Sequence, residues 1–366
     1  MTAGGRESIS AIGVSNLTER WQRGLRSSFR ERLSQGQDFS YINVGDSIAT
    51  GRIGITSKSQ HYAAVAARTA CKHLGLPFRS ALHTADDLWT DGRTLASGRG
   101  WRIEEGGLYG GGSYALDAGS DGAISYLPEP RCRMVRISHL GGFDYSVDAG
   151  ASWSRRQPGS VGRGWRTEIT VGADGLLIRA IPDSGCRVYW LQSVYPDQPG
   201  IAWYTSGIGA TRIGDLHRIL SSDGEAGYQA YGAAAPDLLT LEIGVNDTIH
   251  ADVESVSGSR AALTAVVARL RDHGVSNIAL MGAVPVRADF QPGPWRIADA
   301  YREIYRPTAL EEGLPLLDCA LRWGTYDAAF EAGYVADQVH PTQAGHADVG
   351  AMVAALLLSR TGWTRP

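Results

Sequence analysis

The segment Tyr41–Gly51, YINVGDSIATG, breaks an apolar run abruptly at Gly45-Asp46-Ser47. A short apolar run with β-branched residues is typical of a buried strand, and the small residues that follow indicate a turn into a helix. Ser47 can therefore be a nucleophile presented at the end of a strand, or an ordinary cap of the next helix. These three residues do not decide between the two. A nucleophile would need a base, a residue that orients the base, and an oxyanion site elsewhere in the chain.

The bulk composition is that of an ordinary soluble globular protein. The chain has 366 residues, 43% hydrophobic and 20% charged, with a net charge of −3. This length favours two domains, or one domain with a large insertion. The charge gives no reason to expect nucleic acid as a partner. No apolar run is long enough to span a membrane, and the N-terminus lacks a signal-peptide pattern. We therefore expect a cytoplasmic protein or a component of a phage particle such as a tail.

Strand and helix patterns alternate in two separate parts of the chain. Up to about residue 88, a predicted buried strand precedes a helical pattern that ends at Gly75, a good C-terminal cap. After about residue 200 the same rhythm returns, with an amphipathic helix before Gly274 and a last helix over about 342–360. Alternating strands and helices predict a parallel sheet covered by helices on both faces. In such sheets, sites lie at the carboxyl ends of the strands.

The middle of the chain, residues 89–199, has an all-β pattern. Glycine and Asp-Gly turn signals recur at intervals typical of a sandwich. The segment 167–181, TEITVGADGLLIRAI, is interpreted as a hairpin around Gly-Ala-Asp-Gly. We therefore expect three parts: an N-terminal extension (1–35), a discontinuous α/β domain (36–88 and 200–366), and an inserted, jelly-roll-like β-sandwich (89–199).

Two later segments can complete a site with Ser47. Asn246 in GVND, residues 244–247, follows a predicted strand, and its amide could donate to an oxyanion; alternatively it only shapes a turn. Asp337 lies three residues before His340, close enough to fix the tautomer of the imidazole and leave Nε2 to accept a proton from serine. His250 and His346 are other candidate bases. We favour His340, because it alone has an aspartate at this spacing and a predicted strand end before it.

These segments together resemble a known family. Gly45-Asp46-Ser47, Gly244-Val245-Asn246-Asp247 and Asp337-Gln338-Val339-His340-Pro341 are similar, in order and placement, to conserved blocks of the SGNH/GDSL hydrolase superfamily. The segment TSGIGAT, residues 205–211, is similar to the remaining block, with Ile208-Gly209 in place of Ser-Gly. Gly209 aligns as the oxyanion glycine, with Gly207 as the alternative.

The resemblance covers about residues 36–90 and 200–360. It implies a flavodoxin-like three-layer α/β/α fold with a parallel sheet. It also implies Ser47 as nucleophile, His340 as base and Asp337 as orienting residue, with an oxyanion held by Ser47, Gly209 and Asn246. Ester hydrolysis would proceed through an acyl-serine without a metal or organic cofactor. Some carbohydrate O-acetylesterases of this superfamily have a similar layout, with a β-sandwich between the first two blocks.

The predicted function is therefore a serine esterase that removes O-acetyl groups from a carbohydrate or cell-wall polysaccharide. The alternatives are a lipase or thioesterase on longer acyl chains, and a non-catalytic glycan-binding or virion protein on the same scaffold. Homo-oligomers or a phage particle are possible assemblies. Tryptophans in or beside the insertion, including Trp153 and Trp190, could stack on sugars if exposed, but we expect most of them in the sandwich core. Cys132 and Cys186 could pair, although free buried thiols are the expectation.

Overall fold

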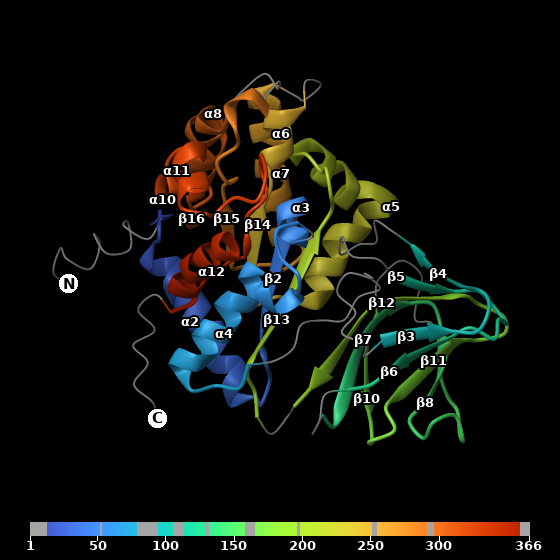
Figure 1. Cartoon of the computed structure of the whole chain (residues 1–366). Coiled ribbons are helices and arrows are strands. Elements are labelled where there is room, and N and C mark those ends of the chain that lie inside the picture. Colours follow the sequence, from blue (N-terminus) through green and yellow to red (C-terminus); the bar gives the residue numbers. More distant parts are fainter. Residues whose placement is uncertain are drawn as a thin grey trace.

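The computed structural model describes residues 13–51, 53–78, 94–104, 113–128, 132–157, 165–195, 198–250, 255–290 and 296–358. Its two parts are a six-stranded sheet covered by helices and a pair of smaller antiparallel sheets, which lie at the lower right in Figure 1.

The large sheet holds the first and the last of the described strands. Its strands, in spatial order, are β1 (Val14–Ser15), β16 (Leu316–Leu317), β15 (Ile278–Met281), β14 (Leu238–Glu242), β2 (Phe39–Gly45) and β13 (Ile201–Gly207). The five strands from β16 to β13 are parallel and follow the flavodoxin-like order. Strand β1 differs from the expected all-parallel sheet, because it adds an antiparallel edge beside β16.

Helices cover both faces of this sheet (Figure 1). Helices α2 (Glu19–Ser34), α4 (Tyr62–Leu74) and α12 (Gln343–Leu358) lie on one face, and α5 (Ile213–Ala234) and α7 (Val256–Asp272) on the other. The predicted cap at Gly75 is confirmed: its left-handed φ of 68° ends α4. The segment expected as an N-terminal extension provides α2, whose Trp21, Leu25 and Phe29 are buried in the core.

Shorter elements complete this part of the chain. They are α3 (Ser47–Thr50), η1 (Lys58–Gln60), α6 (Val245–Ile249), η2 (Ala288–Phe290), α8 (Ile297–Ala300), the π-helical turn η3 (Tyr301–Tyr305), α9 (Arg306–Glu311), α10 (Cys319–Trp323) and α11 (Tyr326–Glu331). Helices α3 and α6 begin directly beyond the carboxyl ends of β2 and β14, at the upper edge of the sheet in Figure 1.

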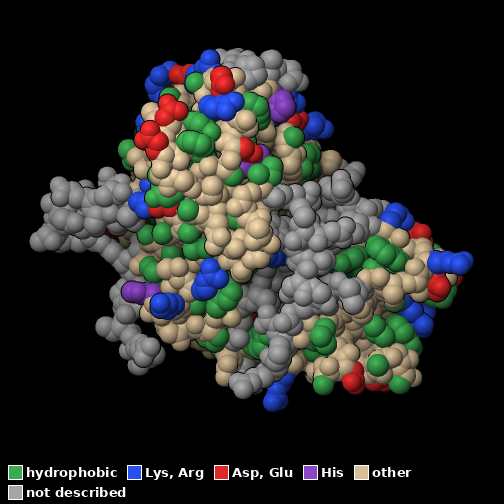
Figure 2. Space-filling model, viewed as in Figure 1, with side chains coloured by type: hydrophobic (Ala, Val, Ile, Leu, Met, Phe, Trp, Pro, Cys, Tyr) green, Lys and Arg blue, Asp and Glu red, His purple; other side chains and the backbone are tan. Residues whose placement is uncertain are grey.

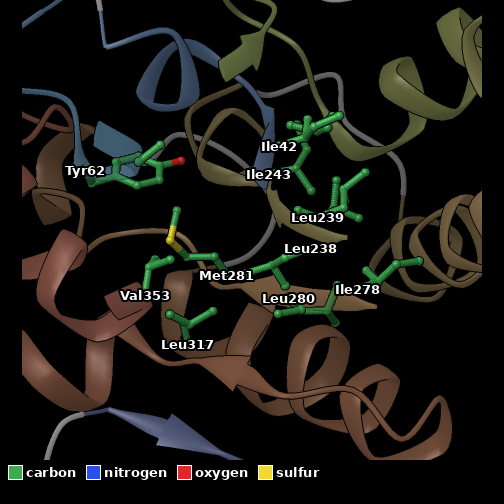
Figure 3. Close-up of a cluster of buried hydrophobic side chains, with 14 of the residues drawn as sticks. Ile42, Tyr62, Leu238, Leu239, Ile243, Ile278, Leu280, Met281, Leu317 and Val353 are labelled. Carbon is green, nitrogen blue, oxygen red and sulfur yellow. The ribbon is translucent and has the colours of Figure 1, made fainter. Parts of the chain in front are cut away.

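One apolar core lies on both faces of the large sheet. Strand β14 is buried at every position, as expected for a strand with helices on both sides. Figure 3 shows Leu280 and Leu317 of the strands alongside Tyr62 of α4 and Val353 of α12. This core fixes the strands, and so fixes where their carboxyl-terminal loops meet.

The described strands between residues 94 and 194 form the two smaller sheets. One sheet has the order β10 (Trp165–Thr170), β7 (Met134–Leu140), β12 (Cys186–Val194), β5 (Ser113–Leu116) and β4 (Trp101–Glu104). The other has the order β3 (Thr94–Ser97), β6 (Ala123–Tyr126), β11 (Leu176–Ala180), β8 (Phe143–Ser146) and β9 (Ser154–Arg156). Side chains of both sheets share one core that is separate from the core of the large sheet.

The expected hairpin over 167–181 is wrong. Strand β10 pairs with β7, whereas β11 pairs with β6 and β8 in the other sheet. The Gly-Ala-Asp-Gly turn therefore carries the chain from one sheet to the other. A turn motif fixes a local reversal, but the partner of each strand is decided by which apolar face it buries.

The structure shows the state of the cysteines and the places of two tryptophans. Cys132 and Cys186 are free thiols, as are the other two cysteines. Trp190 is buried in the core of the large sheet and not in the core of the smaller sheets. The Arg179 guanidinium lies over the ring of Trp153, with its Cζ atom 3.8 Å from the ring centroid. Trp89 and the side chain of Trp165 lie outside the described residues. Within the described chain, no helix has the length and apolarity that crossing a bilayer requires.

Candidate active site

Ser47 stands at the junction of β2 and α3. The Asp46 carboxylate caps α3 by accepting the N–H of Ile48 at 2.9 Å. Only glycine fits at position 45, because a Cβ there would lie 1.7 Å from the Glu242 backbone oxygen. The close approach of β2 and β14 thus presents Ser47 at the sheet edge. Among the described residues, no acceptor takes the N–H of Ser47 itself, so this donor remains available.

His340 lies against Ser47, with its Nε2 atom 3.1 Å from the serine Oγ. Its Nδ1 atom lies 2.9 Å from Asp337 Oδ2. Partial burial would raise the pKa of Asp337, but the backbone N–H groups of Val339 and His340 and the imidazole together hold that pKa below its usual value. The carboxylate is therefore an acceptor, so Nδ1 carries the proton and Nε2 accepts from the Ser47 hydroxyl.

The loop that carries this pair is tied down at both ends. The N–H of Ala336 donates to the His340 carbonyl at 2.7 Å, and the N–H of Thr342 to the Tyr334 carbonyl at 2.9 Å. The Tyr326 hydroxyl donates to the Asp337 carbonyl at 2.8 Å. These bonds fix the imidazole before any substrate binds, which lowers the cost of ordering the site.

The loop after β13 lies on the other side of Ser47. The N–H of Ile208 donates to the Gly45 carbonyl at 2.9 Å, which fixes the loop to the turn that carries Ser47. Gly207 packs so tightly that a Cβ would lie 2.4 Å from both the Asp46 carbonyl oxygen and the Thr50 nitrogen. Gly209 is exposed, and a Cβ there would meet nothing within 4 Å. Gly207 is thus a packing residue, and Gly209 is the exposed glycine of this loop.

Asn246 brings a side-chain donor to the same loop. Its Nδ2 atom donates one hydrogen to the Thr211 carbonyl at 3.0 Å, which leaves the second amide hydrogen for another acceptor. The turn before it requires glycine, because Gly244 has φ of 117° and a Cβ would lie 2.1 Å from the Tyr305 hydroxyl. The structure thus gathers all five residues predicted from sequence at one edge of the large sheet.

The chain is similar to a known family of hydrolases. The profile of the GDSL-like lipase/acylhydrolase family matches residues 169–347. This range holds Gly209, Asn246, Asp337 and His340. It does not include Ser47, because the two smaller sheets lie in the sequence between Ser47 and these four residues. This match, over just under half of the chain, supports an SGNH/GDSL hydrolase. The same match supports a carboxylic ester hydrolase.

Chains similar to this one also occur among solved structures. A peptidoglycan O-acetylesterase is 14% identical, with a TM-score of 0.69 over 93% of this chain and 96% of that chain. A two-domain esterase active on acetylated mannans is 12% identical, with a TM-score of 0.43 over 93% of this chain and 55% of that chain. A lipase/acylhydrolase from Enterococcus faecalis is 17% identical, with a TM-score of 0.36 over 44% of this chain and 77% of that chain. No curated protein matches the hydrolase in sequence.

The other histidines considered as bases lie elsewhere in the hydrolase. His346 is buried in α12, where its ring stacks on Tyr62 at 5.6 Å between centroids and lies 5.2 Å from that of His61. Burial, with a smaller effect of His340, lowers the pKa of His346 to about 4, so it is neutral near pH 7. His250 is the C-cap of α6. The hydrogen bond to Ser47 Oγ is made by His340.

Sequence reasoning missed a group of buried carboxyls beneath the site. Asp46, Glu242 and Asp247 are each no more than 2% exposed. Burial raises the pKa of Asp46 and of Asp247 to about 7, and raises that of Glu242 well above its usual value. Asp247 accepts the N–H of Ile213 at 3.1 Å and so caps α5. The available signal was a single acid in the predicted buried strand 238–242, whose other residues are three leucines and one threonine, because an unpaired charge there would be costly.

Proposed function

We propose that the hydrolase is a serine esterase in which Ser47 is the nucleophile, His340 the general base and acid, and Asp337 the residue that orients His340. The contact that carries this proposal is the 3.1 Å approach of Ser47 Oγ to His340 Nε2. That distance is within reach of direct proton transfer, which a serine hydroxyl needs because it is a weak nucleophile.

In the first step, Ser47 Oγ attacks the ester carbonyl carbon while His340 Nε2 takes the hydroxyl proton. The Asp337 carboxylate stabilises the imidazolium that forms and does not itself take the proton. The tetrahedral intermediate collapses when its carbon–oxygen bond to the alcohol breaks, and His340 returns the proton to the leaving alcohol. The acyl group remains on Ser47.

The oxyanion of this intermediate would be held by three donors. They are the N–H of Ser47, the N–H of Gly209 and the free amide hydrogen of Asn246. Each belongs to a loop fixed by hydrogen bonds in the absence of substrate. Donors that are already oriented stabilise developing charge without a cost of reorganisation.

Deacylation would use the same groups in reverse roles. A water molecule takes the position of the alcohol, and His340 Nε2 removes one of its protons as the oxygen attacks the acyl carbon. The second tetrahedral intermediate collapses to the carboxylic acid, and His340 returns the proton to Ser47 Oγ.

We infer that the substrate is an O-acetylated carbohydrate or cell-wall polysaccharide. The support is the match in fold to a peptidoglycan O-acetylesterase, which spans 93% of this chain and so includes the two smaller sheets. Those sheets have their own core and interrupt the hydrolase between β2 and β13, and we regard them as an inserted β-sandwich. Its binding of glycan stays a prediction, as do a homo-oligomer and a place in a phage tail.

The experiment compares p-nitrophenyl acetate, butyrate and octanoate, followed by acetate release from O-acetylated peptidoglycan and from acetylated mannan. We expect kcat/KM to be highest for the acetyl ester, and Ser47→Ala to lower kcat by about 10³-fold or more on every ester. Ser57→Ala is the matched control, because Ser57 is an N-cap residue without a side-chain cap bond.

Each outcome separates the candidates. Fastest hydrolysis of octanoate would replace the deacetylase by a lipase or thioesterase. An inactive native protein would favour the non-catalytic glycan-binding alternative. Full activity in Ser47→Ala would remove the proposed nucleophile.

A further inference from the structure

Two buried carboxyl groups lie directly beneath the nucleophile turn. Asp46 is 0% exposed and Glu242 is 1% exposed. Asp46 directly follows Gly45, the last residue of β2, which is in register with Glu242 of β14, and the two carboxyls interact. Neither carboxyl has an ion-pair partner among the residues that the structure describes. Asp46 Oδ2 and both oxygens of Glu242 also lack a conventional donor there. Two adjacent carboxylates without a cation cannot both remain ionised in such a site.

The surroundings decide which of the two holds a proton. Asp46 Oδ1 accepts the N–H of Ile48 at 2.9 Å, and the N–H of Gly244 also favours its charged form. For Glu242 the dominant influence is burial, which raises its pKa, and the neighbouring Asp46 raises it further. The backbone N–H groups of Ala49 and Asp46 lower the pKa of Glu242, but by less, so that it stays well above its usual value. The other titratable groups that act on the pair are neutral or acidic: Asp247, Tyr62, Tyr305 and Cys319.

We propose that Glu242 is a positioning residue of the esterase: its neutral carboxyl donates a hydrogen bond to the Asp46 carboxylate and so holds the turn that presents Ser47. Two carboxyls thus share one proton, and this proton does not move during the reaction. The inference deepens the proposed function and rests on Ser47 being the nucleophile.

The hydrogen bond from Glu242 to Asp46 keeps the N–H of Ser47 free for the oxyanion. Asp46 caps the N–H of Ile48, one residue further on, which leaves that of Ser47 to the oxyanion. Without a donor from Glu242, the Asp46 carboxylate loses a contact that fixes its rotamer and can turn toward the N–H of Ser47. That donor matters mainly in the transition state, so its loss lowers kcat with little effect on KM.

Two substitutions of similar length separate the hydrogen bond from the packing. Glu242→Gln keeps a donor toward Asp46, and Glu242→Met fills the space without one. We expect Glu242→Gln to lower kcat by less than about threefold, and Glu242→Met by more than about tenfold with KM nearly unchanged. Native kcat in Glu242→Met, or an equal loss in both variants, would overturn the positioning role.

A measurement on the native protein tests the shared proton without substrate and without a variant. Infrared spectra at pH 8 of protein labelled with [¹³C]glutamate should show a neutral carboxyl band that shifts with the label. Absence of that band would overturn the proposal even if the enzyme is active. Conversely, the band would persist if the protein hydrolysed no ester, so failure of the pair and failure of the esterase function are distinguishable.

Discussion

Ser47 Oγ and His340 Nε2 lie 3.1 Å apart although 293 positions separate the two residues in the chain. The contact forms because β2 delivers Ser47 to the carboxyl edge of the large sheet, where the loop before α12 places His340. The two smaller sheets interrupt the chain between β2 and β13 without disturbing the pairing of these two strands along their full length.

Asp337→Asn tests how His340 is oriented. An amide in place of the carboxylate accepts the Nδ1–H poorly and can present its own N–H instead, which favours the wrong tautomer. We expect kcat on p-nitrophenyl acetate to fall by roughly 10³-fold or more. Asp327→Asn, an exposed aspartate in α11, is the matched control. Equal activity in both variants would mean that Asp337 does not orient the base.

Asn246→Ala removes a side-chain donor from the predicted oxyanion site. We expect kcat to fall by about 10²-fold to 10³-fold with a small change in KM, because the donor acts on charge that develops in the transition state. Asn277→Ala is the control, since Asn277 is equally buried and donates to the Asp237 carbonyl, away from the site. A change in KM alone would assign Asn246 to substrate binding.

Gly45→Ala tests the close approach of β2 and β14. The added Cβ would lie 1.7 Å from the Glu242 backbone oxygen, so the strands must separate. We expect a loss of about 3 kcal/mol in the free energy of unfolding, measured by urea denaturation. Gly209→Ala, where a Cβ meets nothing within 4 Å, should unfold like the native protein. Equal stability of Gly45→Ala and the native protein would contradict this packing.

His346 makes the stability of the fold depend on pH. Its pKa falls from 6.5 to about 4 in the folded state. Below pH 6.5 the unfolded chain therefore binds a proton that the folded protein does not, so stability is lost as pH falls toward 4. The largest contribution of this single group is about 3 kcal/mol.

The measurement is urea unfolding of the native protein and of His346→Asn at pH 7 and pH 4.5. We expect the variant to lose less stability between the two pH values, although not to become independent of pH, because burial also lowers the pKa of His61 and His139. The same loss in both proteins would show that His346 is not buried in its neutral form.

The large sheet and the predicted site could be foreseen because their signals are local. The apolar run before Gly45 and the cap at Gly75 are readable from neighbouring residues. In a parallel sheet, carboxyl ends share one edge, so the order of the short motifs sufficed to bring Ser47, Asn246 and His340 together.

What could not be foreseen depends on contacts between distant segments. The strands β10 and β11 lie on either side of a good turn motif, yet each pairs in a different sheet, because burial in the shared core outweighs the local preference. Glu242 is a single acid in a buried strand, and its meaning depends on the neighbouring Asp46. The charged surface is equally uninformative: Figure 2 shows side chains of both signs scattered over the described part of this face.

The most direct test of the account is covalent labelling of the nucleophile. The native protein is treated with a fluorophosphonate, and the modified residue is located by peptide mass spectrometry. The account predicts a single adduct on Ser47, loss of esterase activity in step with labelling, and no adduct in Ser47→Ala. An adduct on another residue that accompanies the loss of activity, or undiminished labelling of Ser47→Ala, would contradict it.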